Sequence, residues 1–323
     1  MPTLHSHKFA IDTRPFCVWD WDLPDRNLAF LEGIDPNYFA YLAAVHSKGL
    51  ESDERQYSAL ALRLAYSHAL ETLFALIAAT VQAPHCVAGW MTKYLNSDLK
   101  SIVGKINHGQ PVYSRLPISP VTWNQLSKLL IPLSDDDDDD LSWHELFAES
   151  WKSFASDFLN RDLNEEHNCG KHGLRLRGGG FRLAIRPENA PEEEVKSLGG
   201  SEFGSAYYQP EKLGDSRHFR LRKMNRNWNP HQYVGRLQLI SMSMINVLSF
   251  LMAANGADVS NRNAVRPKSK SFFREPWEKT VGAISFNMDM NLDERDISSF
   301  SAHEIIASYD NQRGENDDVD DSP

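Results

Sequence analysis

The chain has 323 residues and a mass of 36.7 kDa, which is enough for one large domain or two modest ones with a buried core. Hydrophobic residues make up 41% and charged residues 24% of the chain, a composition that excludes a collagen, a coiled coil and a chain disordered throughout. The formal charge of −10 disfavours overall attraction to nucleic acid, although Lys and Arg outnumber Asp and Glu between Arg161 and Arg236.

The first half of the chain is predicted to be helical. Residues 1–51 read as an irregular N-terminal extension with a short helix that starts at Asp35-Pro36. Apolar residues then recur at helical spacing over residues 52–83, a pattern that predicts a long core helix ended by Pro84. A second helix is predicted over residues 85–107.

A third helix is predicted after a proline-rich and aspartate-rich connection. It begins at Ser142, where Glu145 completes a capping box, and its pattern continues to His172, before Gly173. We expect the aspartate run at 135–140 to be a solvated loop, because closely spaced like charges repel.

Past Gly173 the pattern alternates and predicts short strands at 174–177, 181–186 and 219–222. The three glycines at 178–180 are expected to form the tight turn of a hairpin between the first two strands, followed by a long loop over 187–217.

A fourth helix starts at Asn229-Pro230 and closes at Asn255-Gly256. A strand near 281–286, a short helix near 302–309 and an acidic, disordered tail over 311–323 complete the chain. The predicted fold class is mainly α: a helical bundle over residues 52–310 with a small antiparallel β-sheet insertion near 174–222.

The compartment is predicted from what the sequence lacks. Its three cysteines, Cys17, Cys86 and Cys169, are too widely spread for a disulfide framework. The first residues have no apolar core of a signal peptide, and no uninterrupted apolar run reaches about 18 residues. We therefore expect a cytoplasmic protein with no membrane partner.

A polar cluster continues the apolar face of the third predicted helix. At 100° per residue, the face of Phe154 and Phe158 extends to Arg161, Glu165, Asn168 and His172, whereas His167 points away from it. Buried ionisable groups need partners, a ligand or a solvent-filled pocket. Two interpretations stay open: a satisfied network at the helix end, with Arg161 paired to Glu165, or a functional pocket.

The segment from Arg161 to His167 resembles the arginine, polar residue, spacer and histidine motif of the HEPN superfamily of helical ribonucleases. Asn168-Cys-Gly-Lys171-His172-Gly173 is also similar to a signature of helical abortive-infection proteins. An upstream amphipathic helix with a polar Glu71 suits the same family.

The resemblance implies a metal-independent endoribonuclease, with the role of a toxin or an antiviral-defence effector. Arg161 and either His172 or His167 would carry the chemistry, because histidine exchanges protons near neutral pH and arginine stabilises phosphate charge. Asn168 and Lys171 would assist, and Glu165 and Glu71 would support the site. The resemblance also implies a homodimer, an RNA substrate and no cofactor, and leaves room for a protein regulator.

Arginines alternate with apolar residues along the predicted strands and share one face. We expect this face to bind RNA phosphates. The alternative is an ordinary half-exposed sheet whose arginines pair with acidic residues. The members of this face are Arg175, Arg177, Arg182, Arg186, Arg220 and Arg222.

The remaining histidines and cysteines offer a metal site and a core residue as further interpretations. His167, Cys169 and His172 are three metal-ligand types within six residues, but no second ligand pair accompanies them, so no metal site is predicted. His68, among alanines and leucines, is predicted to be a core histidine. The alternative function is a non-catalytic helical interaction or regulatory module.

Overall fold

The structure is a computed structural model that describes residues 5–20, 22–113, 120–132, 142–185, 196–212, 219–258, 264–278 and 285–292. It is mainly helical with small antiparallel sheets, which confirms the predicted fold class. The longer helices are α1 (Leu23–Glu32), α2 (Tyr38–Gly49), α3 (Arg55–Gln82), α5 (Asn96–Asn107), α7 (Trp143–Leu159), α8 (Arg161–Lys171) and α9 (Pro230–Ala254). The shorter ones are α4 (Val87–Lys93), α6 (Trp123–Leu130), α10 (Glu275–Glu278) and a 3-10 helix (Lys270–Phe273).

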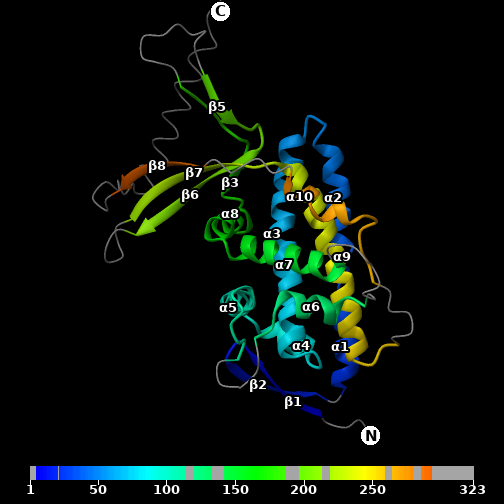
Figure 1. The fold of residues 1–323 in the computed structure, drawn as a ribbon. Helices are drawn as coiled ribbons and strands as arrows, with labels where there is room; N and C mark the ends of the chain where they lie inside the picture. The colour runs from blue at the N-terminus through cyan, green and yellow to red at the C-terminus, as the bar shows by residue number, and fades with distance from the viewer. Residues whose placement is uncertain are drawn as a thin grey trace, which may run out of the picture. The chain divides into compact units, whose positions relative to one another are not determined.

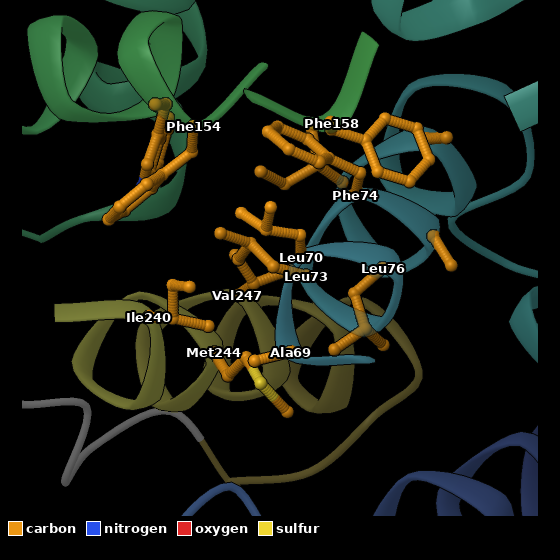
Figure 2. Packing of buried hydrophobic residues seen from close by; sticks show 14 of the residues in the cluster. Ala69, Leu70, Leu73, Phe74, Leu76, Phe154, Phe158, Ile240, Met244 and Val247 are labelled. Carbon is orange, nitrogen blue, oxygen red and sulfur yellow. The ribbon is translucent and has the colours of Figure 1, made fainter. Parts of the chain in front are cut away.

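The two long helices α3 and α9 form the centre of the core. Figure 1 shows them side by side, and Figure 2 shows that Leu70 and Leu73 of α3 meet Ile240 and Val247 of α9. Phe154 of α7 lies in the same close-up. The predicted boundaries of both helices are confirmed to within three residues, because Pro84 and the Asn229-Pro230 pair limit them.

Buried polar contacts connect α7 to the two central helices. The Trp151 indole donates a hydrogen bond to the Ser243 hydroxyl at 2.9 Å. The Asp157 carboxylate accepts from the Tyr66 hydroxyl at 2.6 Å and from the Arg236 guanidinium at 2.9 Å. Trp151, Ser243, Asp157 and Tyr66 thus each have a hydrogen-bond partner, which avoids the cost of an unmade hydrogen bond.

The prediction of a single helix over 142–172 is wrong, because one helix ends at Asn160 and another begins there. The capping box at Ser142 and Glu145 is confirmed, with the Ser142 hydroxyl accepting from the Glu145 amide at 3.2 Å. At Asn160 the backbone is extended, and the side-chain oxygen accepts from the amides of Asp162 and Leu163. Asn160 therefore caps a new helix, α8, whose rotation does not follow that of α7.

Replacement of Asn160 with alanine is expected to lower the free energy of unfolding by about 1 kcal/mol, because two amides of the first turn of α8 lose their acceptor. Urea titration followed by circular dichroism measures the change. Asn124→Ala, an exposed site on α6, is the matched control and should change stability by less than about 0.5 kcal/mol. An equal effect of the two substitutions would contradict the capping role.

Residues 85–107 also differ from their predicted single helix. They form α4 and α5, with an extended turn at Tyr94 and Leu95 between them. The Asp98 carboxylate accepts from the Leu95 amide at 2.9 Å, which starts α5 anew.

The predicted extension contributes an antiparallel hairpin of β1 (His5–Ile11) and β2 (Arg14–Asp20), in which Phe9 pairs with Phe16. Asp12 takes a positive φ of 53° in its turn. The side-chain amide of Gln82 exchanges two hydrogen bonds with the Asp12 backbone, at 2.9 and 3.0 Å, and so holds the hairpin at the end of α3. Side chains from these first elements, including Ile11, Leu31 and Phe39, are buried in the same core as α3.

The remaining strands are β3 (Leu176–Gly178), β4 (Arg182–Ile185), β5 (Lys196–Gly200), β6 (Gly204–Lys212), β7 (Phe219–Asn227) and β8 (Ser285–Leu292). They form one sheet in the order β3-β6-β7-β8 and a second sheet of β4 and β5.

The predicted hairpin through Gly178-Gly179-Gly180 is wrong, because β3 pairs with β6 and β4 pairs with β5. A Cβ on Gly180 would lie 2.2 Å from the Ser201 carbonyl oxygen, so the glycine permits a close approach between backbones. The predicted loop over 187–217 contains the whole of β5 and of β6 in its described part, so this prediction is also wrong there.

The chain divides into two compact units, Met1–Tyr207 with Asn225–Phe286, and Tyr208–Met224 with Asn287–Pro323. The first unit contains all the helices named above. The second contains the outer parts of β6, β7 and β8. The predicted acidic run at 135–140, the helix near 302–309 and the tail at 311–323 lie outside the described residues.

Among the described helices, α3 and α9 are long and apolar enough to cross a membrane by length and composition. The sequence prediction counted only uninterrupted apolar runs, whereas an 18-residue average identifies both segments. Buried core helices of soluble proteins share these properties, and 67% and 56% of the residues in the two windows are buried in this fold.

Candidate functional site

The predicted site residues on α8 do not form one buried face. Arg161 is the first residue of α8, its side chain is 82% exposed, and its Nε lies 2.7 Å from Glu165 Oε1. Asn168 and His172 are exposed as well. The prediction that these four residues continue the apolar face of α7 is wrong, because the break at Asn160 resets the helix phase.

Arg161 and His172 also fail to converge. They stand at opposite ends of α8, which has 11 residues and is therefore about 16 Å long. The His172 amide donates to the Asn168 carbonyl at 3.0 Å, and the His172 carbonyl accepts from Arg175 Nε at 2.9 Å. These backbone contacts make His172 the C-terminal cap of α8.

A cleft of about 510 Å³ lies where α2, α3 and α8 meet, and three of the predicted residues line it: His167, Lys171 and Glu71. We call it the α2–α3–α8 cleft. Its other lining residues are Tyr38, Leu42 and His46 of α2, Ala61, Leu64, Ala65, His68 and Thr72 of α3, Tyr94, and Gly170 of α8.

The close approach of α8 to α3 depends on Gly170. A Cβ at this position would lie 2.5 Å from a methyl group of Leu64 and 2.8 Å from one of Leu176. The absent side chain therefore lets α8 lie against α3, where its neighbours His167 and Lys171 reach the cleft.

The pKa of His167 is strongly shifted in the cleft. Burial, together with the positive charges of Lys171 and Arg63 and the neighbouring His68, lowers the pKa of His167 to about 4. Its Nδ1 is buried and has no hydrogen-bond partner among the described residues. The imidazole is therefore neutral at pH 7 and able to accept a proton. An anion in the cleft would raise the pKa of His167 again, because it would offset the two cations.

The other imidazoles of the cleft come from α2 and α3. The ring of His68 packs edge-on against Phe39, with 5.2 Å between ring centroids, which orients it. His68 is close enough to His167 for its charge to lower the pKa of that residue. His46 lines the cleft from α2.

Glu71 contributes the negative charge of the cleft. Burial and the Glu71 carboxylate, with which the Tyr94 hydroxyl forms a hydrogen bond, raise the pKa of Tyr94 to about 12. Burial lowers the pKa of Lys100, and Glu71 opposes this change. A protonated tyrosine and a lysine therefore surround the carboxylate.

A buried ion pair fixes the orientation of α8. Arg63 of α3 and Glu166 of α8 lie 2.6 Å apart, and both side chains are 3% exposed. The second Glu166 oxygen accepts from the Ser205 hydroxyl at 2.5 Å and from the Trp228 indole at 3.2 Å. Burial alone would raise the pKa of Glu166, but Arg63 and Ser205 outweigh it and hold that pKa below its usual value. The carboxylate thus stays charged inside the protein.

The predicted arginine face is not gathered at the cleft. Arg175, Arg177 and Arg182 are exposed in the first unit, and Arg186 lies outside the described residues. Arg220 and Arg222 belong to the second unit, where Glu211 lies 4.0 and 3.0 Å from them. For these two arginines the structure therefore agrees with the expectation that the strand arginines pair with acidic residues.

Within the described residues, no group of three His, Cys, Asp or Glu side chains is arranged to hold a metal ion. None of the described cysteines forms a disulfide, and burial raises the pKa of Cys86 and of Cys169. Their thiols are therefore weak nucleophiles.

Sequence reasoning missed His68, which was predicted to be a core residue, and His46. The signal that could have found His68 is its position on the stripe Ala61, Ala65, His68 and Thr72, where small and polar residues follow each other at helical spacing. Such a stripe leaves space that larger apolar side chains would fill.

Comparison of the chain with protein-family models, with curated proteins and with solved structures found no match.

The stability of the protein is expected to fall as the pH drops from about 6.5 to about 4. Across this range unfolded His167 binds a proton, whereas folded His167, facing Lys171, Arg63, His68 and Glu166, stays neutral. The contribution of neutral His167 to the free energy of unfolding is therefore fully present above pH 6.5, and it is lost as the pH falls to the pKa of the folded state. Urea unfolding at pH 7.5 and pH 5 measures it, and His167→Gln should lose less stability than the wild type. Equal losses would contradict a neutral, half-buried His167.

Proposed function

We propose that this chain is a metal-independent endoribonuclease whose site is the α2–α3–α8 cleft. The observation that carries the proposal is that His68 and His167, from two different helices, line one cleft together with Lys171, and that the charges of Lys171 and His68 act on His167. RNA cleavage without a metal needs a base for the 2′-hydroxyl, an acid for the leaving oxygen and a cation for the charged intermediate. The cleft holds candidates for all three.

The roles follow from charge. Neutral His167 accepts the 2′-hydroxyl proton, and the 2′-oxygen then attacks the adjacent phosphorus. Lys171 stabilises the extra negative charge on the phosphorane. The P–O5′ bond breaks, and His68, acting in its protonated form, donates its own proton to the leaving 5′-oxygen. The products are a 2′,3′-cyclic phosphate and a free 5′-hydroxyl end.

This proposal keeps the predicted reaction and changes its residues. Arg161 and His172 no longer carry the chemistry, because they stand apart at the two ends of α8. A toxin or antiviral-defence role, an RNA partner and a homodimer remain part of the proposal, as does a cytoplasmic location.

The direct test uses a single-stranded oligonucleotide with one ribonucleotide in a DNA background, incubated with the purified full chain in EDTA. We expect one cut, 3′ to the ribonucleotide, and a product with a cyclic phosphate end by mass spectrometry. An all-DNA oligonucleotide of the same sequence is the control. A cut in the control, or no cut in any RNA, would reject the proposed reaction. Expression of the wild-type chain should also slow growth of the host.

The alternative, a non-catalytic interaction module, is favoured by large apolar side chains that face solvent. Tyr41 and Val45 of α2 are 64% and 44% exposed, and Tyr57 of α3 is 78% exposed. Such a surface is typical of protein interfaces. Light scattering of the purified chain tests self-association, and Tyr41→Ser with Val45→Ser should return any dimer to a monomer.

A further inference from the structure

A second cavity, of about 530 Å³, lies between α9, the start of α2 and the segment 265–275. None of its lining residues is shared with the α2–α3–α8 cleft. Its volume lies within the range of pockets that bury small organic ligands, about 300–1,000 Å³. We call it the α9 pocket.

The wall of the α9 pocket opposite α9 is held in place by hydrogen bonds. The buried side chain of Asn246 donates to the Val265 carbonyl at 2.8 Å and accepts from the Val265 amide at 2.8 Å. The Ser269 hydroxyl accepts from the Ser271 amide at 3.2 Å and so caps the 3-10 helix. Because the wall is fixed before a ligand arrives, binding needs little ordering of the chain.

Ser241 marks the polar point of this pocket. It lines the cavity from α9, it is only 3% exposed, and its Oγ has no hydrogen-bond partner in the described part of the chain. A buried hydroxyl without a partner is unfavourable, so a hydrogen-bonding group placed at Ser241 would gain more than one exposed to water.

The rest of the lining determines what else the ligand must carry. Met242, Val265 and Phe272 offer apolar surface, which favours a hydrophobic body. Lys268 and Glu275 are both exposed at the pocket and have opposite charges, so neither sign of net charge is favoured.

We propose that the α9 pocket is a binding site for an uncharged, amphipathic small molecule, with a hydroxyl or carbonyl group at Ser241 and an apolar ring or branched body against Met242, Val265 and Phe272. The proposal is independent of the reaction proposed for the cleft.

The test compares two probes that differ by one hydroxyl group, 1-naphthol and naphthalene, in equilibrium dialysis against the purified full chain. Both are expected to bind the wild type. In Ser241→Ala, the ratio of 1-naphthol affinity to naphthalene affinity should fall about fivefold to tenfold, the factor that one hydrogen bond contributes. Ala40→Phe, which places a ring inside the pocket, should abolish binding of both probes.

Ser249→Ala is the matched control, because it makes the same change on α9 outside this pocket and should leave the ratio unchanged. Circular dichroism establishes that each variant is folded. The proposal is overturned if the wild type binds neither probe, if Ser241→Ala leaves the ratio unchanged, or if Ala40→Phe binds both probes as the wild type does.

Discussion

Replacement of Glu166 with alanine is expected to lower the free energy of unfolding by about 3–5 kcal/mol, because it leaves the buried Arg63 without its counterion. The substitution also removes the acceptor of the Ser205 hydroxyl and of the Trp228 indole. A loss of this size is a large part of the total stability of a typical domain. Urea titration of the full chain measures it.

Glu165→Ala is the matched control for Glu166→Ala, since it removes a carboxylate from the next residue of the same helix. The partner of Glu165 is Arg161, which is 82% exposed, and exposed pairs contribute about 0.2–1 kcal/mol. The double variant Arg63→Met with Glu166→Met should be more stable than Glu166→Ala alone, because it buries no unpaired charge. Similar losses for Glu166→Ala and Glu165→Ala would show that the buried ion pair contributes no more to stability than the exposed one.

His167→Ala is expected to slow cleavage of RNA by about 10²- to 10⁴-fold, the usual contribution of a general base. The loss should appear in kcat, because the imidazole accepts the proton in the transition state and contributes little to substrate binding. Gel assays with saturating oligonucleotide in EDTA measure the rate.

His172→Ala is the control for His167→Ala, because it removes an imidazole from the same helix at a position that does not line the cleft. It should retain activity within a few-fold of the wild type, and so should Arg161→Ala. If His172→Ala or Arg161→Ala abolishes cleavage while His167→Ala does not, the site proposed at the cleft is wrong and the motif predicted from the sequence carries the chemistry.

The long helices were predictable because their signals are local. The apolar spacing of α3 and α9 repeats over many turns, and Pro84 and Asn229-Pro230 mark ends that require no knowledge of distant residues. The break between α7 and α8 also had a local signal, since Asn160 is a good N-cap residue and Asp162 follows in the first turn. The uninterrupted aromatic stripe before Asn160 concealed it.

Strand pairing was not predictable, because it joins residues far apart in the chain. Leu176 pairs with Tyr207 across a segment that includes β4 and β5, and neighbouring strands in sequence are the usual first assumption. The cleft depends on such distant contacts too. Sequence reasoning named His167, Lys171 and Glu71, but their meeting with His68 follows from the packing of α8 on α3.

The short helix α8 carries a stabilising carboxylate and the proposed base on adjacent residues, Glu166 and His167. Adjacent positions on a helix differ by about 100°, so the anchoring of one side chain inside the protein sets the direction of the other. Substitution of Glu166 can therefore reduce the proposed RNA cleavage by reorienting the His167 side chain, although Glu166 itself does not contact RNA. Loss of activity on substitution of Glu166 therefore does not show that Glu166 takes part in catalysis. A separate measurement of the His167 environment, for example an NMR titration of its imidazole, distinguishes the two roles.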